Sequence, residues 1–266
     1  MDKPKFQTQL FINNEFVDAL EGATFDVFNP FDNSLLAKVS EARPADIDRA
    51  VAAARKAFPA WAAMSPSDRG VLIGKLADAI EKDRDNLALI ETLDTGHPIR
   101  DTRNLDVMRT VATFRYFAGM PDKNEGTVIP VDTGFLNYVT RVPVGVVGQV
   151  VPWNFPLMFT SWKLGPALAA GNCVVMKQAE LTPLSTLRVA ELARDVGFPP
   201  GVINVVPGFG HIAGQYLAEH KGVDKISFTG STVTGRRIVQ ASAGNLKRVQ
   251  LELGQVLARD VAESRH

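Results

Sequence analysis

The chain has 266 residues, enough for about two domains, and its 45% apolar and 22% charged content is typical of a soluble globular protein. The formal net charge is zero, so nothing favours nucleic acid or a membrane surface as a partner, and Gly, Pro, Gln and Asn interrupt every long apolar stretch, which argues against a membrane span. Cys173 is the only cysteine, so no disulfide can form within these residues, and the four scattered histidines lack the spacing of a metal site.

The N-terminal part of the chain predicts short strands followed by helices. The first residues, MDKPKFQTQ, are polar and lack the apolar region of a secretory signal, which together with the single cysteine predicts a cytoplasmic protein. Residues 9–17 read as two strands around a tight turn at Asn13-Asn14, because asparagine tolerates positive φ. Helical patterns follow at residues 45–61, 67–89 and 99–119. In the third of these helices the expected inward residues are Leu105, Met108, Val111, Ala112 and Phe117.

The pattern changes at residue 127, where strands become the dominant prediction. Residues 127–131 and 135–142 alternate apolar and polar side chains around Asp132-Thr133-Gly134, which indicates a β-hairpin. Apolar strands then alternate with helical segments, the strands being expected at 145–151, 172–176, 202–206, 225–228 and 248–253. Such alternation predicts an α/β fold with a Rossmann-like parallel sheet and helices on both faces.

The stretch KISFTGSTVTG at residues 225–235 is a candidate anion site. A strand runs into Gly230, Ser231 or Thr232 can cap the helix that follows, and Gly235 leaves the surface clear of side chains. The backbone N–H groups and the dipole of a helix N-terminus favour an anion, and phosphate is the natural occupant. An ordinary strand-to-helix turn is the alternative, and the stretch does not match a Walker A loop.

Several polar residues stand at or just past the ends of the predicted parallel strands. They are Asn154, Lys177, Glu180, Gly208, Gly230 and Glu252. Ligands of such sheets bind outside the carboxyl ends of the strands, so this convergence predicts a ligand site. Taken singly, Lys177 and Glu180 could be a solvated pair, Asn154 a helix cap and Glu252 a surface charge.

Four ordered motifs carry a family resemblance. They are PWNFP at 152–156, GNCVVMKQAE at 171–180, FTGSTVTG at 228–235 and LELG at 251–254. Together they resemble the NAD(P)-dependent aldehyde dehydrogenase superfamily, over nearly the whole chain. The resemblance implies a variant Rossmann fold, an aldehyde substrate oxidised to an acid, and NAD as cofactor, with NADP also admitted. It also implies that residues 1–254 form the coenzyme-binding domain, including the helices of 45–120 and an oligomerisation hairpin at about 127–142.

The resemblance assigns roles to individual residues. Asn154 matches the oxyanion donor and Glu252 the general base that activates water. The residues implied in cofactor binding are Val151, Pro152, Trp153, Lys177, Glu180, Gly210, Phe228, Gly230, Ser231, Thr234, Gly235 and Leu253. Because a carboxylate beside the ribose hydroxyls repels a 2′-phosphate, Glu180 predicts a preference for NAD over NADP.

The chain also departs from the family pattern. Gly254 is followed by Gln255-Val256 instead of Gly-Lys, and residues 255–266 form a divergent tail. The family's nucleophilic cysteine lies beyond LELG, so we expect the catalytic domain to be absent from these residues and homo-oligomer formation, which the family implies, to be impaired. A truncated, inactive NAD-binding fragment is therefore the alternative. Cys173 is expected to be a buried structural thiol, and Gln178 replaces the family's proline after Lys177.

Overall fold

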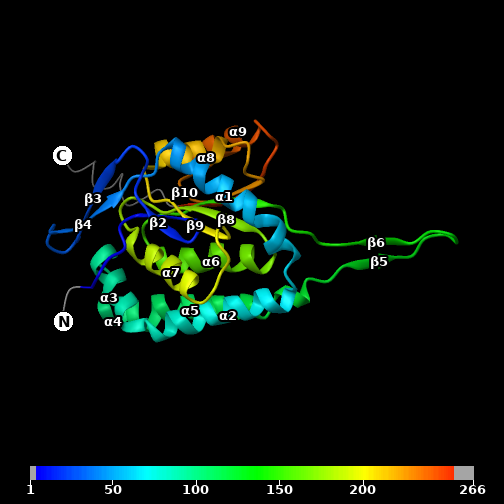
Figure 1. Ribbon diagram of the computed structural model, residues 1–266, viewed down its shortest axis with the longest axis horizontal. Coiled ribbons are helices and arrows are strands. Elements are labelled where there is room, and N and C mark those ends of the chain that lie inside the picture. The colour runs from blue at the N-terminus through cyan, green and yellow to red at the C-terminus, as the bar shows by residue number, and fades with distance from the viewer. Residues whose placement is uncertain (1–3, 255–266) are drawn as a thin grey trace.

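The fold is built around one mixed sheet, seen in a computed structural model that describes residues 4–254 (Figure 1). The order of strands in this sheet is β11-β10-β7-β8-β9-β1-β2. The strands are β1 (Leu10–Ile12), β2 (Glu15–Val17), β7 (Val146–Val150), β8 (Cys173–Lys177), β9 (Ile203–Val205), β10 (Lys225–Gly230) and β11 (Arg248–Leu253). From β11 to β9 all neighbours pair in parallel, which confirms the predicted Rossmann-like core. Residues of β7, β8 and β9 are buried throughout, as their apolar runs require.

Helices cover both faces of this sheet (Figure 1). The view shows α1, α8 and α9 above the sheet, α6 and α7 below it, and α2 and α5 in a further layer beneath. Their bounds are α1 (Pro44–Ala63), α2 (Pro66–Lys82), α3 (Arg84–Thr95), α4 (Ile99–Asp101), α5 (Val107–Ala118), α6 (Pro156–Ala169), α7 (Leu184–Asp195), α8 (Gln215–Glu219) and α9 (Thr232–Ser242). Short turns complete the set: the π-helical η1 (Thr102–Asp106) and η3 (Gly210–Gly214) and the 3-10 helix η2 (Pro121–Lys123).

Three antiparallel hairpins surround the core. The predicted hairpin β1–β2 turns at Asn13 and Asn14, whose φ values are 55° and 64°, and β1 extends the sheet beside β9. The second hairpin, β3 (Thr24–Phe28) with β4 (Leu35–Ser40), was not predicted as strands, although the Asn29-Pro30 turn lies between them. The third, β5 (Thr127–Ile129) with β6 (Asn137–Val139), projects as a long arm from the body (Figure 1).

Two of the predicted helices differ from those observed. The helix expected at 67–89 is divided at Asp83, which ends α2 and begins α3. The carboxylate of Asp83 accepts two hydrogen bonds from Arg188 of α7, of 2.8 and 2.9 Å, and this contact is distant in sequence. The prediction of one continuous helix was therefore wrong, because a tertiary ion pair holds the break.

The helix expected at 99–119 contains the π-helical turn η1, and this changes which side faces inward. A π turn adds one residue to a helical turn. The inward face predicted from a uniform period of 3.6 residues is therefore rotated about the helix axis on passing the π turn. Leu105 is 44% exposed and Ala112 is also exposed, so their inward assignment was wrong. The buried side of α5 instead carries Val107, Thr110, Val111 and Phe114.

Buried carboxylates from α3 cap the helices that follow β7 and β8. The N–H of Leu157 in α6 donates to Glu91 Oε1 over 3.2 Å, and the N–H of Leu184 in α7 donates to Asp94 Oδ2 over 2.9 Å. Thr182, which precedes α7, does not cap it with its side chain, because its hydroxyl donates to the Trp153 carbonyl over 3.0 Å. Both carboxyl groups are buried, and burial raises the pKa of Glu91 from 4.5 to about 8 and the pKa of Asp94 well above its usual range.

This burial predicts that stability falls with rising pH. Because the folded-state pKa of Glu91 lies above its ordinary value, its contribution is complete below about pH 4.5 and is lost as the pH rises through about 8. Each such group adds a slope of up to about 1.4 kcal/mol per pH unit to the free energy of unfolding. Urea unfolding of the wild type and of Glu91→Gln between pH 5 and pH 8 measures how the free energy of unfolding depends on pH. The free energy of unfolding of the variant should fall less steeply with pH than that of the wild type. Equal slopes would contradict a raised pKa of Glu91 in the folded state.

Candidate functional site

The candidate site lies where the direction of chain progression through the sheet reverses. The chain proceeds from β7 through β8 to β9 on one side, and then returns to β10 and β11 on the other side of β7. The carboxyl ends of β7 and β10 therefore lie next to each other at a topological switch point. Open parallel sheets bind ligands in the crevice at such a point. The sequence-predicted site residues lie in the last residues of β7, β8, β9, β10 and β11 or in the segments that follow them, so the fold gathers them on this edge.

The turn from β10 into α9 has the geometry of an anion site. Ser231 is the N-cap of α9, and its Oγ accepts the N–H of Thr234 over 3.2 Å, which confirms the predicted cap. The other N–H groups of this first turn face the carboxyl edge of the sheet. The hydroxyl Oγ1 of Thr229, at the end of β10, is buried and has no hydrogen-bond partner among the described residues.

The two glycines of this turn lie close against neighbouring side chains. A Cβ atom on Gly230 would lie 2.5 Å from the ring of Phe228, and one on Gly235 would lie 2.6 Å from Leu253. The interpretation that these glycines only leave the surface clear was therefore incomplete. Phe228 and Leu253, both implied in cofactor binding, are the residues against which the turn packs.

Lys177 and Glu180 form a partly buried pair after β8. The Lys177 side chain is 3% exposed, and its Nζ lies 3.6 Å from Glu180 Oε2. Burial lowers the pKa of Lys177 from its usual value. The alternative of a solvated surface pair is thus wrong for Lys177. Gly214 of η3 lies beside the Lys177 stem, and Gly210, the first residue of η3, is exposed with open space around it.

Gln178, which replaces the family's proline, is tied down by hydrogen bonds. Its side chain is buried, and its Nε2 donates to the carbonyl of Thr182 over 3.1 Å. Thr182 in turn donates to the carbonyl of Trp153 in the next loop. The loops after β7 and β8 are therefore linked, which positions Lys177 relative to Trp153.

Asn154 lies in the loop between β7 and α6. The N-cap of α6 is Phe155 and makes no side-chain cap bond, so Asn154 is not a helix cap. Its Oδ1 is buried and has no hydrogen-bond partner among the described residues, and no hydrogen bond there engages its Nδ2, so the N–H donors of the amide are available to a ligand. Of the neighbouring residues implied in cofactor binding, Val151 is buried, Pro152 is half-buried and Trp153 is 46% exposed.

Glu252 and a lysine that the sequence analysis missed lie near the same edge. Glu252 is exposed on β11, directly beside Thr229 of β10. Lys163 is buried on α6, and its Nζ donates to Ser227 Oγ over 3.0 Å. Burial lowers the pKa of Lys163, and the charge of Glu252 opposes that shift. A lone lysine in an otherwise apolar helix was the available signal, because such a charge is buried only with a partner.

Cys173 is a structural thiol, as expected. It is the first residue of β8 and is fully buried, and burial raises its pKa from 9.0 to about 12. Such a thiol is protonated at neutral pH and is out of reach of a substrate, so it cannot act as a nucleophile.

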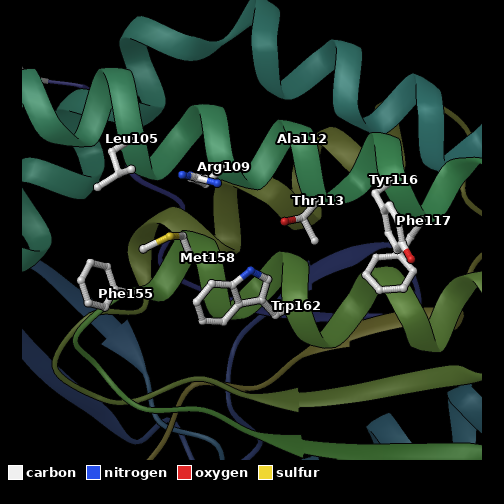
Figure 2. Close-up of a pocket in the computed structure, with 9 residues that line it drawn as sticks. All are labelled: Leu105, Arg109, Ala112, Thr113, Tyr116, Phe117, Phe155, Met158 and Trp162. Carbon is white, nitrogen blue, oxygen red and sulfur yellow. The ribbon is translucent and has the colours of Figure 1, made fainter.

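A groove runs along the surface where α5 packs against α6 (Figure 2). It has a volume of about 540 Å³ and is lined by Leu105, Arg109, Ala112, Thr113, Tyr116, Phe117, Phe155, Met158 and Trp162. Phe155, which directly follows Asn154, lies at one end of the groove opposite Leu105 (Figure 2). Its ring packs against His97 at 5.0 Å, and His97 Nδ1 lies 2.9 Å from Asp106 Oδ2. The sequence analysis had given His97 no role.

Metal clusters and membrane-crossing helices are both missing from residues 4–254. Within that range, no group of three or more His, Cys, Asp or Glu residues is arranged to hold a metal ion. No helix there combines the length and apolar character that crossing a membrane requires.

Comparison with known proteins identifies a family. The model of the "Aldehyde dehydrogenase family" matches residues 16–259. The mitochondrial aldehyde dehydrogenase of Homo sapiens is 52% identical over 254 residues, which are 94% of this chain and 49% of that protein. The chain spans about half the length of the curated relatives it matches.

Solved structures agree with this similarity. PnpE from Pseudomonas sp. WBC-3 is 66% identical with a TM-score of 0.92, and the match covers 93% of this chain and 51% of that one. An NAD+ complex of the aldehyde dehydrogenase from Bacillus cereus is 51% identical with a TM-score of 0.91, over 93% of this chain and 51% of that one. The motif-based resemblance is thereby confirmed.

Proposed function

The chain belongs to the aldehyde dehydrogenase family, and on that basis we propose that it forms the coenzyme-binding part of an enzyme that oxidises an aldehyde to a carboxylic acid with NAD. One observation carries the proposal: Asn154, Lys177 with Glu180, and the N-terminus of α9 converge on the carboxyl edge at the switch point. We assign residues 1–254 to this part, of which 4–254 are described, whereas the divergent tail, 255–266, lies outside the described residues. A reducing compartment such as the cytoplasm fits the single unpaired thiol.

The donor set fits a dinucleotide. The free N–H groups at the start of α9 suit a pyrophosphate, and the ammonium of Lys177 and the carboxylate of Glu180 suit ribose hydroxyls as donor and acceptor. The buried, unpartnered Thr229 Oγ1 offers a further polar contact at the same edge. Trp153 and Val151 would border the nucleotide from the β7 side. When bound, the coenzyme accepts hydride from the substrate.

Asn154 and Glu252 have separate roles in the proposed reaction. The overall change converts an aldehyde, NAD+ and water into an acid, NADH and a proton. The Asn154 amide donates a hydrogen bond to the substrate oxygen as negative charge develops there. Glu252 accepts a proton from the attacking water.

The groove between α5 and α6 is the proposed path for the aldehyde. It begins at Phe155, next to Asn154, and its lining is mostly aromatic and aliphatic. An aldehyde with an apolar body could therefore lie along it with the carbonyl oxygen toward Asn154.

A second function, that of an NAD-binding fragment without turnover, is favoured by Cys173. The family chemistry requires a thiolate, and the one cysteine of these 266 residues is buried with a raised pKa. The two functions share the coenzyme site and differ in whether an aldehyde is consumed.

Formation of NADH by the whole protein that contains these residues tests the proposal. Absorbance at 340 nm should rise when NAD and a simple aldehyde such as hexanal are both present, with hexanoate as the product by mass spectrometry. Binding of NAD without turnover of any aldehyde in a broad panel would support the second function.

Coenzyme preference follows from Glu180. Its carboxylate would accept hydrogen bonds from the ribose hydroxyls of NAD and would repel the 2′-phosphate of NADP. We expect calorimetric titration to give a lower Kd for NAD than for NADP. Glu180→Gln should reduce the ratio of the two Kd values about tenfold, which corresponds to ~1.4 kcal/mol of binding free energy. Tighter binding of NADP by the wild type would argue against this role of Glu180.

The arm formed by β5 and β6 is the proposed site of self-association. Its apolar side chains are exposed, among them Val128, Phe135, Leu136 and Tyr138. Both strands have free edges that can pair with another chain. Light scattering should show oligomers whose mass falls on replacing Phe135 and Leu136 by aspartate together. A wild-type protein that stays monomeric at high concentration would refute this.

A further inference from the structure

The groove between α5 and α6 carries a single charged residue on an otherwise uncharged lining. On η1 its lining residue is Leu105, and on α5 they are Arg109, Ala112, Thr113, Tyr116 and Phe117, so that successive turns contribute to one stripe. On α6 the facing stripe is Met158 and Trp162, preceded by Phe155. Figure 2 shows Arg109 within this row, between Leu105 and Thr113 and facing Met158.

Arg109 has no protein partner among the described residues. No hydrogen bond or ion pair joins its guanidinium to another side chain of residues 4–254, whereas Arg100, Arg103 and Arg115 of the same helical segment all contact aspartate. The nearest acid along the helix, Asp106, is buried and bonded to His97 on the other side. The groove itself contains no carboxylate.

A guanidinium bordered by apolar and aromatic side chains selects for an anion. Its fork of N–H donors matches a carboxylate in two parallel hydrogen bonds, and charge-assisted bonds of this kind are strengthened where water is displaced by apolar walls. A neutral aliphatic chain would gain contact with the rings but would leave the guanidinium without its hydration or a counter-charge.

The position of Arg109 sets where the anion must lie. Arg109 is one turn, about 6 Å, along the helix from Leu105, which lies opposite Phe155, the residue that directly follows Asn154 in the sequence (Figure 2). A substrate with its carbonyl at Asn154 would thus reach Arg109 with a group several bonds away.

We propose that Arg109 is a specificity-determining residue and that the preferred substrates are aldehydes with a carboxylate at the far end of the chain. This inference rests on the proposed function, because it takes Asn154 as the end of the groove where the aldehyde reacts.

Steady-state kinetics with a matched pair of substrates, measured on the whole protein that contains these residues, test the proposed role of Arg109. We compare kcat/KM for 6-oxohexanoate and for hexanal, which differ in the terminal carboxylate. The wild type should favour 6-oxohexanoate. Arg109→Met, which keeps the length and helix propensity of the side chain, should lower the ratio at least tenfold, mainly through KM, and Arg109→Lys should restore part of it. Arg100→Met, an exposed arginine outside the groove, serves as the control and should change nothing.

A measurement of ligand binding distinguishes a failure of this inference from a failure of the proposed function. Calorimetry with hexanoate and with hexan-1-ol needs no turnover. If neither aldehyde is oxidised but hexanoate binds and loses at least fivefold in affinity on Arg109→Met, the anion subsite stands and the proposed function fails. If hexanal is oxidised and Arg109→Met leaves both the substrate ratio and hexanoate binding unchanged, the function stands and the inference is overturned. Absence of any hexanoate binding together with equal kcat/KM values overturns it as well.

Discussion

Replacing Asn154 by alanine in the whole protein is expected to lower kcat for aldehyde oxidation by about 100- to 1000-fold, the loss typical of one oxyanion donor. The reason is that Asn154 lies at the switch point and its Nδ2 donates to no other described residue, so an N–H group is free to donate to the charge that develops on the substrate oxygen. The Kd for NAD should stay within about twofold, because the proposed coenzyme contacts are made by Lys177 and Glu180 and by the start of α9.

Steady-state kinetics and calorimetry on the same Asn154→Ala preparation give both quantities. Circular dichroism provides the control for folding. A kcat within about threefold of wild type would contradict the role of Asn154. An equal loss of NAD affinity would move Asn154 from the reaction to coenzyme binding.

A polypeptide limited to residues 1–266 is expected to form no NADH from NAD and any simple aldehyde. Oxidation through a thiohemiacetal requires a reactive thiolate, and Cys173 is fully buried with its pKa raised to about 12. In the proposed reaction Asn154 and Glu252 act on an intermediate that this thiol cannot form, and groups that act as a unit lose most of their effect without the nucleophile.

The matched sample is Cys173→Ala, assayed beside the wild-type polypeptide for NADH formation and for ester hydrolysis. Turnover that disappears in Cys173→Ala would overturn the structural role of Cys173. Turnover that persists would require another nucleophile or a contaminating enzyme, which mass spectrometry of the preparation distinguishes.

The parallel core was predictable because its signals are local. Strands buried on both faces must be apolar along their length, and β7 and β8 are, so their positions agree with the prediction to within about two residues. The N-cap of α9 by Ser231 was equally predictable, since a helix cap depends on residues that are neighbours in sequence.

Features that depend on distant contacts were not predictable. The break at Asp83 is held by Arg188, and the cap of α7 comes from Asp94 of α3, so neither has a signal near the affected helix end. The π turn η1 displaced the expected inward face of α5 because the periodicity argument assumes uniform helical turns. That displacement brings Leu105 and Ala112 to the groove, so the substrate side of the site was hidden from the sequence pattern.

The coenzyme site was inferred more completely than the groove. Its residues follow strand ends, and the fold brings strand ends together by rule, so Lys177, Glu180 and Gly230 could be grouped in advance. Lys163 and Arg109 lie within helices, where a charged residue most often faces solvent, and only the packing distinguishes them.

The most direct test of the coenzyme site is a crystal structure of the protein with NAD bound. The account predicts the pyrophosphate at the N-terminus of α9 beside Ser231, and the adenosine ribose within hydrogen-bond distance of Lys177 and Glu180. A nucleotide bound elsewhere, or one whose ribose contacts neither of these side chains, would contradict it.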